Sequence, residues 1–387
     1  MKDIHSAVHA GYALALGYSL KEMTPRAMYS IGQPVLRACF AGILFTGILS
    51  WPVPGLCAAL SSKDGPDTTE GRRPSISESH PINARLGPLH LRGQSPFQLL
   101  RLSLIPVGAD RVEQGRWLLN ATATWTNRWA WKEGQYLVDA EILRMAVSAA
   151  YGVTDWMQLR LEIPFCVRGG GALDGFIMGF HDTFGYTQAG RDQFPKNQFH
   201  IVFWRKDGTK FELDSSHAGA GLEDVVLSST FRLARGGKWA PQTCLTVHLK
   251  MPTGDEEELF GSGSLDGGLA LCFAKRIWKL YGYLGVQYTR FGDDEVAGMS
   301  MRQDQVSVLT ALEVPLSSRF SILAQYLFNT GSADDFYEFA ESTHEVTLGA
   351  KGEVFRNTVF EFGLMENLLH YDNSPDFGIH FGVSRKF

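Results

Sequence analysis

Residues 157–165 read MQLRLEIPF, an unbroken alternation of apolar and polar side chains. Because successive side chains of a β-strand point to opposite faces, this segment has one apolar face and one face that carries Arg160 and Glu162. The same alternation recurs from Trp117 to the last residue, in segments of about ten residues separated by breaks. The pattern therefore predicts a β-protein built from many similar strands.

Twelve segments of this kind can be counted. They begin near Trp117, Tyr136, Trp156, Asp224, Thr243, Leu265, Leu280, Gln303, Phe320, Thr343, Thr358 and Asp376. In the second segment the alternation slips near Ile142 and Leu143, which predicts a β-bulge at that point.

The breaks between the segments separate a membrane barrel from a soluble sandwich, which would show the same alternation. The short breaks are GVTD (152–155), ARGGKWAP (234–241), RIWK (276–279), PLSSR (315–319) and VFRN (354–357), whereas 167–221 and 253–264 are long. Short periplasmic turns alternating with longer outer loops produce this order. We therefore expect an all-β fold, a transmembrane antiparallel up-and-down β-barrel of about twelve strands, preceded by a signal peptide and a short periplasmic or lumenal segment.

The N-terminal region contains the one long apolar run of the chain, residues 38–59, which follows Arg37. Pro52 and Pro54 interrupt this run and leave an apolar stretch too short to span a bilayer comfortably. The small residues at its end are typical of a Sec-type signal peptide, and a membrane anchor is the alternative. We therefore expect residues 1–59 to be an N-terminal extension and cleaved signal peptide, and residues 60–115 to be a polar linker and N-terminal plug-like segment. Residues 116–387 should form the outer-membrane β-barrel, with a long extracellular loop at 167–221.

The C-terminus ends the last alternating segment. Phe387, Val383, Phe381 and Ile379 resemble the signal that the barrel-assembly machinery reads in outer-membrane proteins, and Arg385 departs from that pattern. This resemblance implies a Gram-negative outer membrane, with its lipids, lipopolysaccharide and assembly machinery as partners. The net charge of -5 and the lack of a basic block argue against nucleic acid as a partner.

Several stretches resemble the outer-membrane barrels grouped as domain of unknown function 3187. They are GPLHLRGQSPFQLLRLSLIP (87–106), VDAEILR (138–144) with YGVTDWMQLRLEIPF (151–165), and LDGFIMGFHDTFGYTQAGRDQFPKN (173–197). GLEDVVLSSTFRL (221–233) and LKMPTGD (249–255) are more weakly similar to barrels of the phenol-pathway transporter type. The resemblance covers nearly all of the chain after Pro81 and implies fold and location, since the family carries no assigned activity.

The long loop is the first candidate for a functional site. One hypothesis is a pore constriction, with the loop folded into the barrel mouth and Asp174, His181, Asp182 and Arg191 narrowing it. A second is lipid hydrolysis by His181 or His217 with Ser215 or Ser216, although no catalytic signature is present and we expect no enzyme. A third is a packed cap whose charges pair with one another.

The inward faces of the strands are the second candidate. Their polar residues include Arg160, Glu162, Asp224, Arg232, His248, Lys250, Glu313, Glu345, Lys351 and Glu361. Ionisable groups inside a barrel either line water or pair with each other, so a pore and a filled interior both stay open. Residues 87–107 carry Pro88, Pro96 and Pro106, which exclude a central strand, and a plug in the lumen would bury their leucines.

Cys244 and Cys272 lie at similar distances from the loop that joins their segments, on the same inward face. This placement permits a cross-strand disulfide in an oxidising compartment, and two small lumen-filling residues are the alternative. No Cys or His spacing matches a zinc site, and we expect no metal and no cofactor.

The function that fits these features is passive passage of small molecules, apolar ones included, across the outer membrane. The alternatives are a structural or surface-interaction barrel without an open pore and, further away, an outer-membrane lipid-modifying enzyme.

Overall fold

The computed structural model describes residues 85–387, with the exception of 109–111, 206, 335 and 370. The predicted signal peptide and most of the linker that follows it lie outside the described residues. Among the described residues, no helix is long and apolar enough to cross a membrane.

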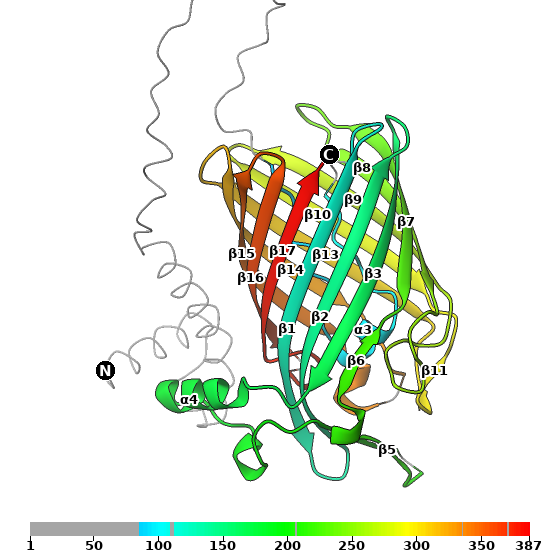
Figure 1. The fold of residues 1–387 in the computed structure, drawn as a ribbon, viewed down its shortest axis with the longest axis vertical. Coiled ribbons are helices and arrows are strands. Elements are labelled where there is room, and N and C mark those ends of the chain that lie inside the picture. Colours follow the sequence, from blue (N-terminus) through cyan, green and yellow to red (C-terminus); the bar gives the residue numbers. More distant parts are fainter. Residues whose placement is uncertain (1–84, 109–111, 206, 335, 370) are drawn as a thin grey trace, which may run out of the picture. The chain divides into compact units, whose positions relative to one another are not determined.

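Twelve long strands of the described chain form a closed antiparallel barrel (Figure 1). They are β1 (Trp117–Lys132), β2 (Tyr136–Gly152), β3 (Met157–Gly169), β7 (Val225–Arg235), β8 (Gln242–Met251), β9 (Asp266–Ile277), β10 (Leu280–Arg290), β13 (Asp304–Pro315), β14 (Phe320–Asn329), β15 (Thr343–Phe355), β16 (Thr358–Leu369) and β17 (Phe377–Lys386). Each begins within one residue of its predicted start. The predicted barrel fold and strand number are confirmed.

Closure pairs the two ends of the described strand array. β1 pairs with β17 from Leu118 opposite Lys386 to Asn127 opposite Phe377. Because every strand then has two neighbours, the barrel has no exposed edge whose backbone groups would be left without partners in a bilayer.

The two ends of the barrel differ in their connections. At the end that carries the C-terminus, the connections are short: 153–156, 236–241, 278–279, 316–319 and 356–357. At the other end they are 170–224, 252–265, 291–303, 330–342 and 370–376, together with the tight turn 133–135 between the two longest strands. We call these the short-turn end and the long-loop end.

Shorter elements cluster at the long-loop end. They are α3 (Pro96–Leu100), α4 (Asp174–Phe184), β4 (His200–Trp204), β5 (Lys210–Leu213), β6 (Gly219–Leu222), β11 (Glu295–Val296), β12 (Met299–Ser300), and the 3-10 turns η2 (Arg191–Gln193), η3 (Ser215–His217), η4 (Tyr337–Ala340) and η5 (Tyr371–Asn373). Strand β4 pairs with the first four residues of β2, at the long-loop end, and β5 pairs with β4.

The wall alternates as a membrane barrel should. In β3 the inward side chains are buried while Leu159, Leu161 and Ile163 face outward and are exposed. The same holds around the barrel for Leu119, Val147, Leu227, Val247, Leu249, Leu269, Leu271, Leu284, Val286, Val306, Leu312, Phe360 and Phe381. This outward set forms the apolar belt that lipid would cover.

The predicted bulge in the second strand is wrong. β2 pairs with β1 without interruption from Tyr136 to Tyr151, and the register shifts lie instead in β7, between Arg232 and Ala234, and at both ends of the β15–β16 pair. The first seven residues of β2 are buried on both faces. Apolar residues therefore occur on both sides, and the alternation fades although the register is unchanged.

Candidate functional site

Residues 85–107 run inside the barrel, and we call them the plug. At the short-turn end the backbone N–H groups of Leu86 and Gly87 donate to the Glu313 carboxylate at 2.9 and 3.2 Å. Further along, the N–H of Leu89 donates to Gln325 Oε1 at 3.1 Å. The plug backbone, which has no strand partner, thus finds acceptors on the inner wall.

The plug turns at the long-loop end and comes back. The N–H of Gln94 donates to Glu345 Oε1 at 2.9 Å, just before helix α3. After the helix, the N–H of Leu102 donates to Asp266 Oδ2 at 3.0 Å, and the N–H of Val112 donates to Gln158 Oε1 at 2.8 Å. Because Gln158 lies beside a short turn, the plug leaves the lumen at the end where it entered.

The ten predicted lumen residues all lie on the inward side of the wall. Nine are buried, and Arg232 is half-buried: Arg160, Glu162, Asp224, Arg232, His248, Lys250, Glu313, Glu345, Lys351 and Glu361. Lys250 Nζ lies 3.2 Å from Asp266 Oδ2 and also pairs with Asp224. Lys351 Nζ lies 2.7 Å from Glu361 Oε2. In this state most of these groups pair with other wall residues or hold the plug, whereas no side-chain hydrogen bond or ion pair joins Arg160 or Arg232 to another described residue.

An aromatic cluster surrounds the tip of the plug. Phe97 of α3 stacks on Phe203 of β4, with ring centroids 5.7 Å apart, and meets Phe339 edge-on at the same distance. Phe336 joins this cluster from the same connection as Phe339. The tip is therefore fastened to the loops that cover the mouth by apolar packing, in addition to its hydrogen bonds.

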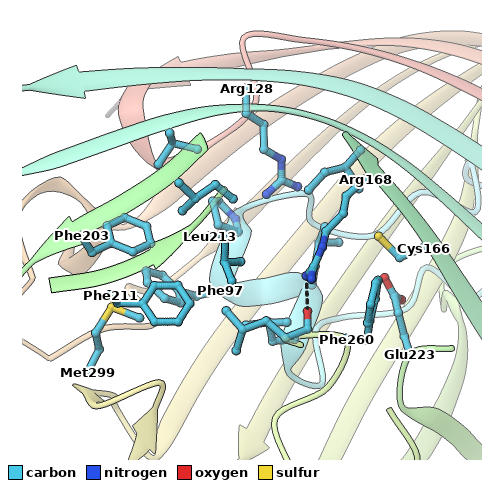
Figure 2. Close-up of a pocket in the computed structure, with 17 residues that line it drawn as sticks. Phe97, Arg128, Cys166, Arg168, Phe203, Phe211, Leu213, Glu223, Phe260 and Met299 are labelled. Atoms are coloured by element: carbon cyan, nitrogen blue, oxygen red, sulfur yellow. Dashed lines mark hydrogen bonds between the residues drawn. The ribbon is translucent and has the colours of Figure 1, made fainter. Parts of the chain in front are cut away.

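A pocket opens beside the plug tip in the mouth of the barrel (Figure 2). It encloses about 700 Å³ between its lining atoms, part of it open to solvent. Its lining is mostly apolar: Pro96, Phe97, Leu99, Leu100, Val138, Ile142, Cys166, Ile201, Phe203, Phe211, Leu213, Leu259, Phe260 and Met299. Arg128, Arg168 and Glu223 supply the only charges of this lining. A lining of this composition suits a small, largely apolar molecule.

Two of the three charged groups are neutralised by protein partners. Arg168 Nη2 lies 3.2 Å from Glu258 Oε2, and its Nε donates to the His217 carbonyl at 3.0 Å. Glu223 Oε2 accepts from Arg144 Nε at 2.7 Å. Arg128 differs, because its one hydrogen bond goes from Nη2 to the Gln94 carbonyl of the plug.

Sequence reasoning did not find this pocket, although two signals were present. The inward face of β1 carries Asn120, Thr122, Thr124 and Thr126. Arg128 is the next residue on this face, two positions after Thr126. Within the long loop, the run of β-branched and aromatic residues IVFW (201–204) marks the short strand β4, which brings Phe203 to the pocket.

The four residues of the predicted constriction do not meet across the lumen. Asn127 faces outward, since its neighbour Arg128 faces inward, and its amide binds both Asp174 Oδ1 at 3.1 Å and Arg191 Nη2 at 2.9 Å. Arg191 and Asp174 form an ion pair of 3.0 Å. This correction has a simple cause: the loop packs its charges against the outer side of the wall, as α4 lies in Figure 1.

The other two members of that set bind within the same loop. His181 Nδ1 is 2.9 Å from the carbonyl oxygen of Thr187, and Asp182 Oδ1 accepts from Gln188 at 2.7 Å. These contacts agree with a packed loop, and they do not narrow a pore.

Comparison with known protein families shows to which family the chain belongs. The family model described as "Protein of unknown function (DUF3187)" matches residues 75–387. The chain belongs to this family. No curated protein is significantly similar to it in sequence. The match covers the plug and the whole barrel, so both are features of a DUF3187 protein.

Solved structures similar to this DUF3187 protein are outer-membrane proteins of low sequence identity. The COG4313 outer membrane channel from Pseudomonas putida F1 has a TM-score of 0.50 at 13% identity, covering 73% of this chain and 100% of that chain. The NanC porin has a TM-score of 0.40 at 11% identity, covering 70% and 100%. A deletion mutant of TodX, titled a monoaromatic hydrocarbon channel, has a TM-score of 0.38 at 9% identity, covering 77% and 99%.

The candidate catalytic pair of the DUF3187 protein lies in one exposed turn. Ser216 Oγ and Asp214 Oδ1 both approach the same ring nitrogen, His217 Nδ1, at 3.2 and 3.1 Å. Hydrogen bonds from Ser216 lower the pKa of the Asp214 carboxyl to about 2. A catalytic triad needs its serine and its carboxylate on opposite nitrogens of the histidine, so this group is a capped turn.

The remaining predicted residues lie in the wall. Cys244 and Cys272 are directly opposite each other in β8 and β9, and they form no disulfide in this structure. Ile379 and Phe381 face outward on β17 opposite Trp125 and Ala123 of β1. Within the described residues, no group of three or more His, Cys, Asp or Glu side chains is placed to hold a metal ion.

Proposed function

We propose that this protein is an outer-membrane channel that passes small, mainly apolar molecules and is closed at rest by its own plug. The apolar pocket between the plug tip and the mouth carries the proposal. A molecule bound there would contact Phe97 and Leu100 of α3, so its arrival is coupled directly to the segment that blocks the lumen. The outward apolar belt supports a location in a membrane, with the short turns on the periplasmic side.

The chemistry of the wall agrees with passage and not with turnover. Polar inward residues such as His248 and Lys250 pair inside the barrel, and they present a water-compatible surface once the plug moves. We infer that the protein works without covalent chemistry on its cargo.

Recording from single channels in planar bilayers tests the proposal. The native protein should show rare, brief openings, because the plug fills the lumen. A variant in which residues 86–107 are replaced by a Gly-Ser linker of equal length should show steady conductance steps. Absence of conductance from both proteins, each verified as a folded barrel by its faster migration before heating, would overturn the proposal.

A barrel without a pore is the second candidate, and the plug itself favours it. Its backbone binds inner-wall acceptors on several strands, among them Glu313, Gln325 and Glu345. If the native protein stays closed while apolar molecules bind its pocket without crossing, the barrel is a receptor or a structural protein, and the lumen is sealed permanently.

A further inference from the structure

Arg128 is a buried cation that forms no ion pair with a carboxylate. Its side chain is 4% exposed and lines the pocket, as Figure 2 shows. Its Nη2 donates to the Gln94 carbonyl, and its Nε is buried without any hydrogen-bond partner. Among the described residues, no carboxylate lies within ion-pairing distance of it. A buried charge of this kind is costly unless something pairs with it.

The surroundings do not offer that partner. Glu223 is the one carboxylate in the pocket lining, and Arg144 already holds it. The plug adds further positive charge, since Arg92 binds Ser103 and backbone carbonyls, and Arg101 binds backbone carbonyls while stacking on Phe291. The region around the pocket therefore carries three guanidinium groups that form no ion pair, although carboxylates such as Glu345 and Glu223 attract them from a longer distance.

We propose, on the basis of the proposed function, that the pocket takes an amphipathic carboxylate whose acid group binds Arg128. The apolar body of the ligand lies among Phe203, Phe211 and Met299, and the carboxylate accepts hydrogen bonds from the unpaired edge of the guanidinium group. A guanidinium group is well suited to this role because its planar donors match the two oxygens of a carboxylate.

This arrangement also connects binding with the plug. The Nη2 that binds the plug carbonyl of Gln94 belongs to the same guanidinium group that would receive the ligand. A carboxylate is a stronger acceptor than a backbone carbonyl, so it competes for this donor and weakens one contact between the plug tip and the wall.

A matched pair of probes tests the site in the full-length protein. Calorimetry in non-ionic detergent compares 4-phenylbutyrate with 4-phenylbutanol, which differ only in the acid group, after subtraction of protein-free micelles. One charge-assisted hydrogen bond contributes about 1.5–3 kcal/mol, so the acid should bind the native protein about 10- to 100-fold more tightly than the alcohol. Arg128→Gln should abolish this preference and leave the alcohol unchanged, and Arg128→Lys should restore part of it.

The controls keep the two proposals separate. Arg232→Gln removes an inward arginine outside the pocket and should change nothing. Equal binding of acid and alcohol to the native protein, or an unchanged preference in Arg128→Gln, would overturn this inference and leave the apolar pocket intact. Binding of neither probe would count against the proposed function itself.

A second inference rests on the outer side of the wall. Phe176, Phe180 and Phe184 are spaced by four residues along α4 and so form one stripe. Phe176 is 59% exposed and Phe184 49% exposed, and the ring of Phe176 lies 6.3 Å from that of Phe377 on the outward face of β17. The stripe therefore continues the apolar belt of the barrel.

The helix also lies where the outer wall begins to carry polar residues. Nearer the short-turn end, Ile379 and Phe381 face outward, whereas at the level of the helix the polar residues Asn127, Asp139 and Glu141 join Phe377 and Trp129 on the outward face. Asn127 is ten residues beyond Trp117, which corresponds to about 25 Å along the axis of a tilted strand, the height of a membrane-barrel belt. We propose that α4 lies in the membrane surface, with its aromatic stripe at the boundary between acyl chains and headgroups of the outer leaflet.

Spin labelling tests this position. A nitroxide on Phe184→Cys in phospholipid nanodiscs should be relaxed by oxygen and protected from a water-soluble nickel complex, whereas one on Asp192→Cys should behave in the opposite way. The native protein, whose described cysteines are buried, should take up no label under the same conditions. Equal exposure of both labels to the nickel complex would overturn the proposal.

Discussion

Two adjacent residues of β1, Asn127 and Arg128, separate the two irregular regions of this molecule. Arg128 points inward and donates to the plug, whereas Asn127 points outward and binds the ion pair of the long loop. We call the part of that loop between Gly170 and Phe199 the outer segment. Both regions lack barrel strands, and both contain a buried arginine, yet one fills the lumen and the other covers the wall.

The difference between them lies in how each satisfies its polar groups. The plug brings few anions, and its backbone relies on wall residues such as Glu313 and Glu345. The outer segment brings its own ion pair, Asp174 with Arg191, and needs only an amide from the wall. The face on which a wall residue lies, and not the length of a loop, thus decides which side of the barrel the segment occupies.

Removing each region in turn is the strongest test of this comparison, and the expected contrast is large. Loss of the plug should open a steady conductance, whereas loss of residues 172–195 should leave the conductance of the native protein unchanged. The second deletion can be closed with a short linker, because Gly170 touches the backbone of Asn197. Larger conductance after the second deletion would show that the outer segment blocks the pore.

Arg191→Met should detach the outer segment and spare the barrel. Removing one member of a buried ion pair costs about 3–5 kcal/mol, because Asp174 keeps a buried charge without its partner. Limited proteolysis should then cleave between residues 172 and 195 at least 100-fold faster, while the barrel keeps its heat-modifiable migration. Arg290→Gln breaks an exposed pair with Asp304, worth about 1 kcal/mol at most, and should leave this cleavage unchanged.

Glu313→Gln should loosen the plug at the short-turn end of the barrel. The substitution weakens the bonds from Leu86 and Gly87 by removing the charge of the acceptor, at a cost of about 1–2 kcal/mol. Open probability in bilayer recordings should rise about 5- to 30-fold. Glu353→Gln, which removes a carboxylate that binds Asn357 in a short turn, is the matched control and should have no effect.

The smallest expected effect concerns Cys244 and Cys272, which pack with Leu104 of the plug on the inner wall. Directly opposite residues of antiparallel strands have Cα atoms about 4.5–5.5 Å apart, a range that permits a disulfide. Mild oxidation should therefore reduce the thiol count of the denatured mature protein from three to one without changing conductance. Three thiols after oxidation would contradict this.

Much of the barrel could be predicted because the alternation of inward and outward side chains can be seen within each short stretch of sequence. Alternation with a period of two, interrupted by short and long breaks, located the start of each of the twelve barrel strands to within one residue and assigned Lys250 and Glu361 to the inward face. The register of Cys244 opposite Cys272 also followed, since a hairpin loop sets it. Such features depend on neighbours in sequence.

The pocket and the outer segment could not be predicted in this way. Their geometry depends on contacts between distant residues, such as Phe97 with Phe203 and Arg191 with Asn127. The constriction hypothesis relied on charge alone, and charge does not say on which face of a wall a loop will lie. The bulge expected near Ile142 was also wrong because of distant contacts. The loops bury the outer face of β2 as well as its inner face, so apolar residues occur on both faces and the sequence pattern looks like a register shift.

The course of the plug has a mechanical consequence. Since it enters and leaves through the same opening, no part of it is threaded through the barrel, and it can be drawn out as a loop while all twelve strands stay paired. A pull on Arg85 would load the contact at Glu313 first, then Gln325, then Glu345 at the tip. Contacts that break in sequence yield to a much smaller force than contacts that must break together. The plug is therefore arranged to be released one contact at a time from the short-turn end.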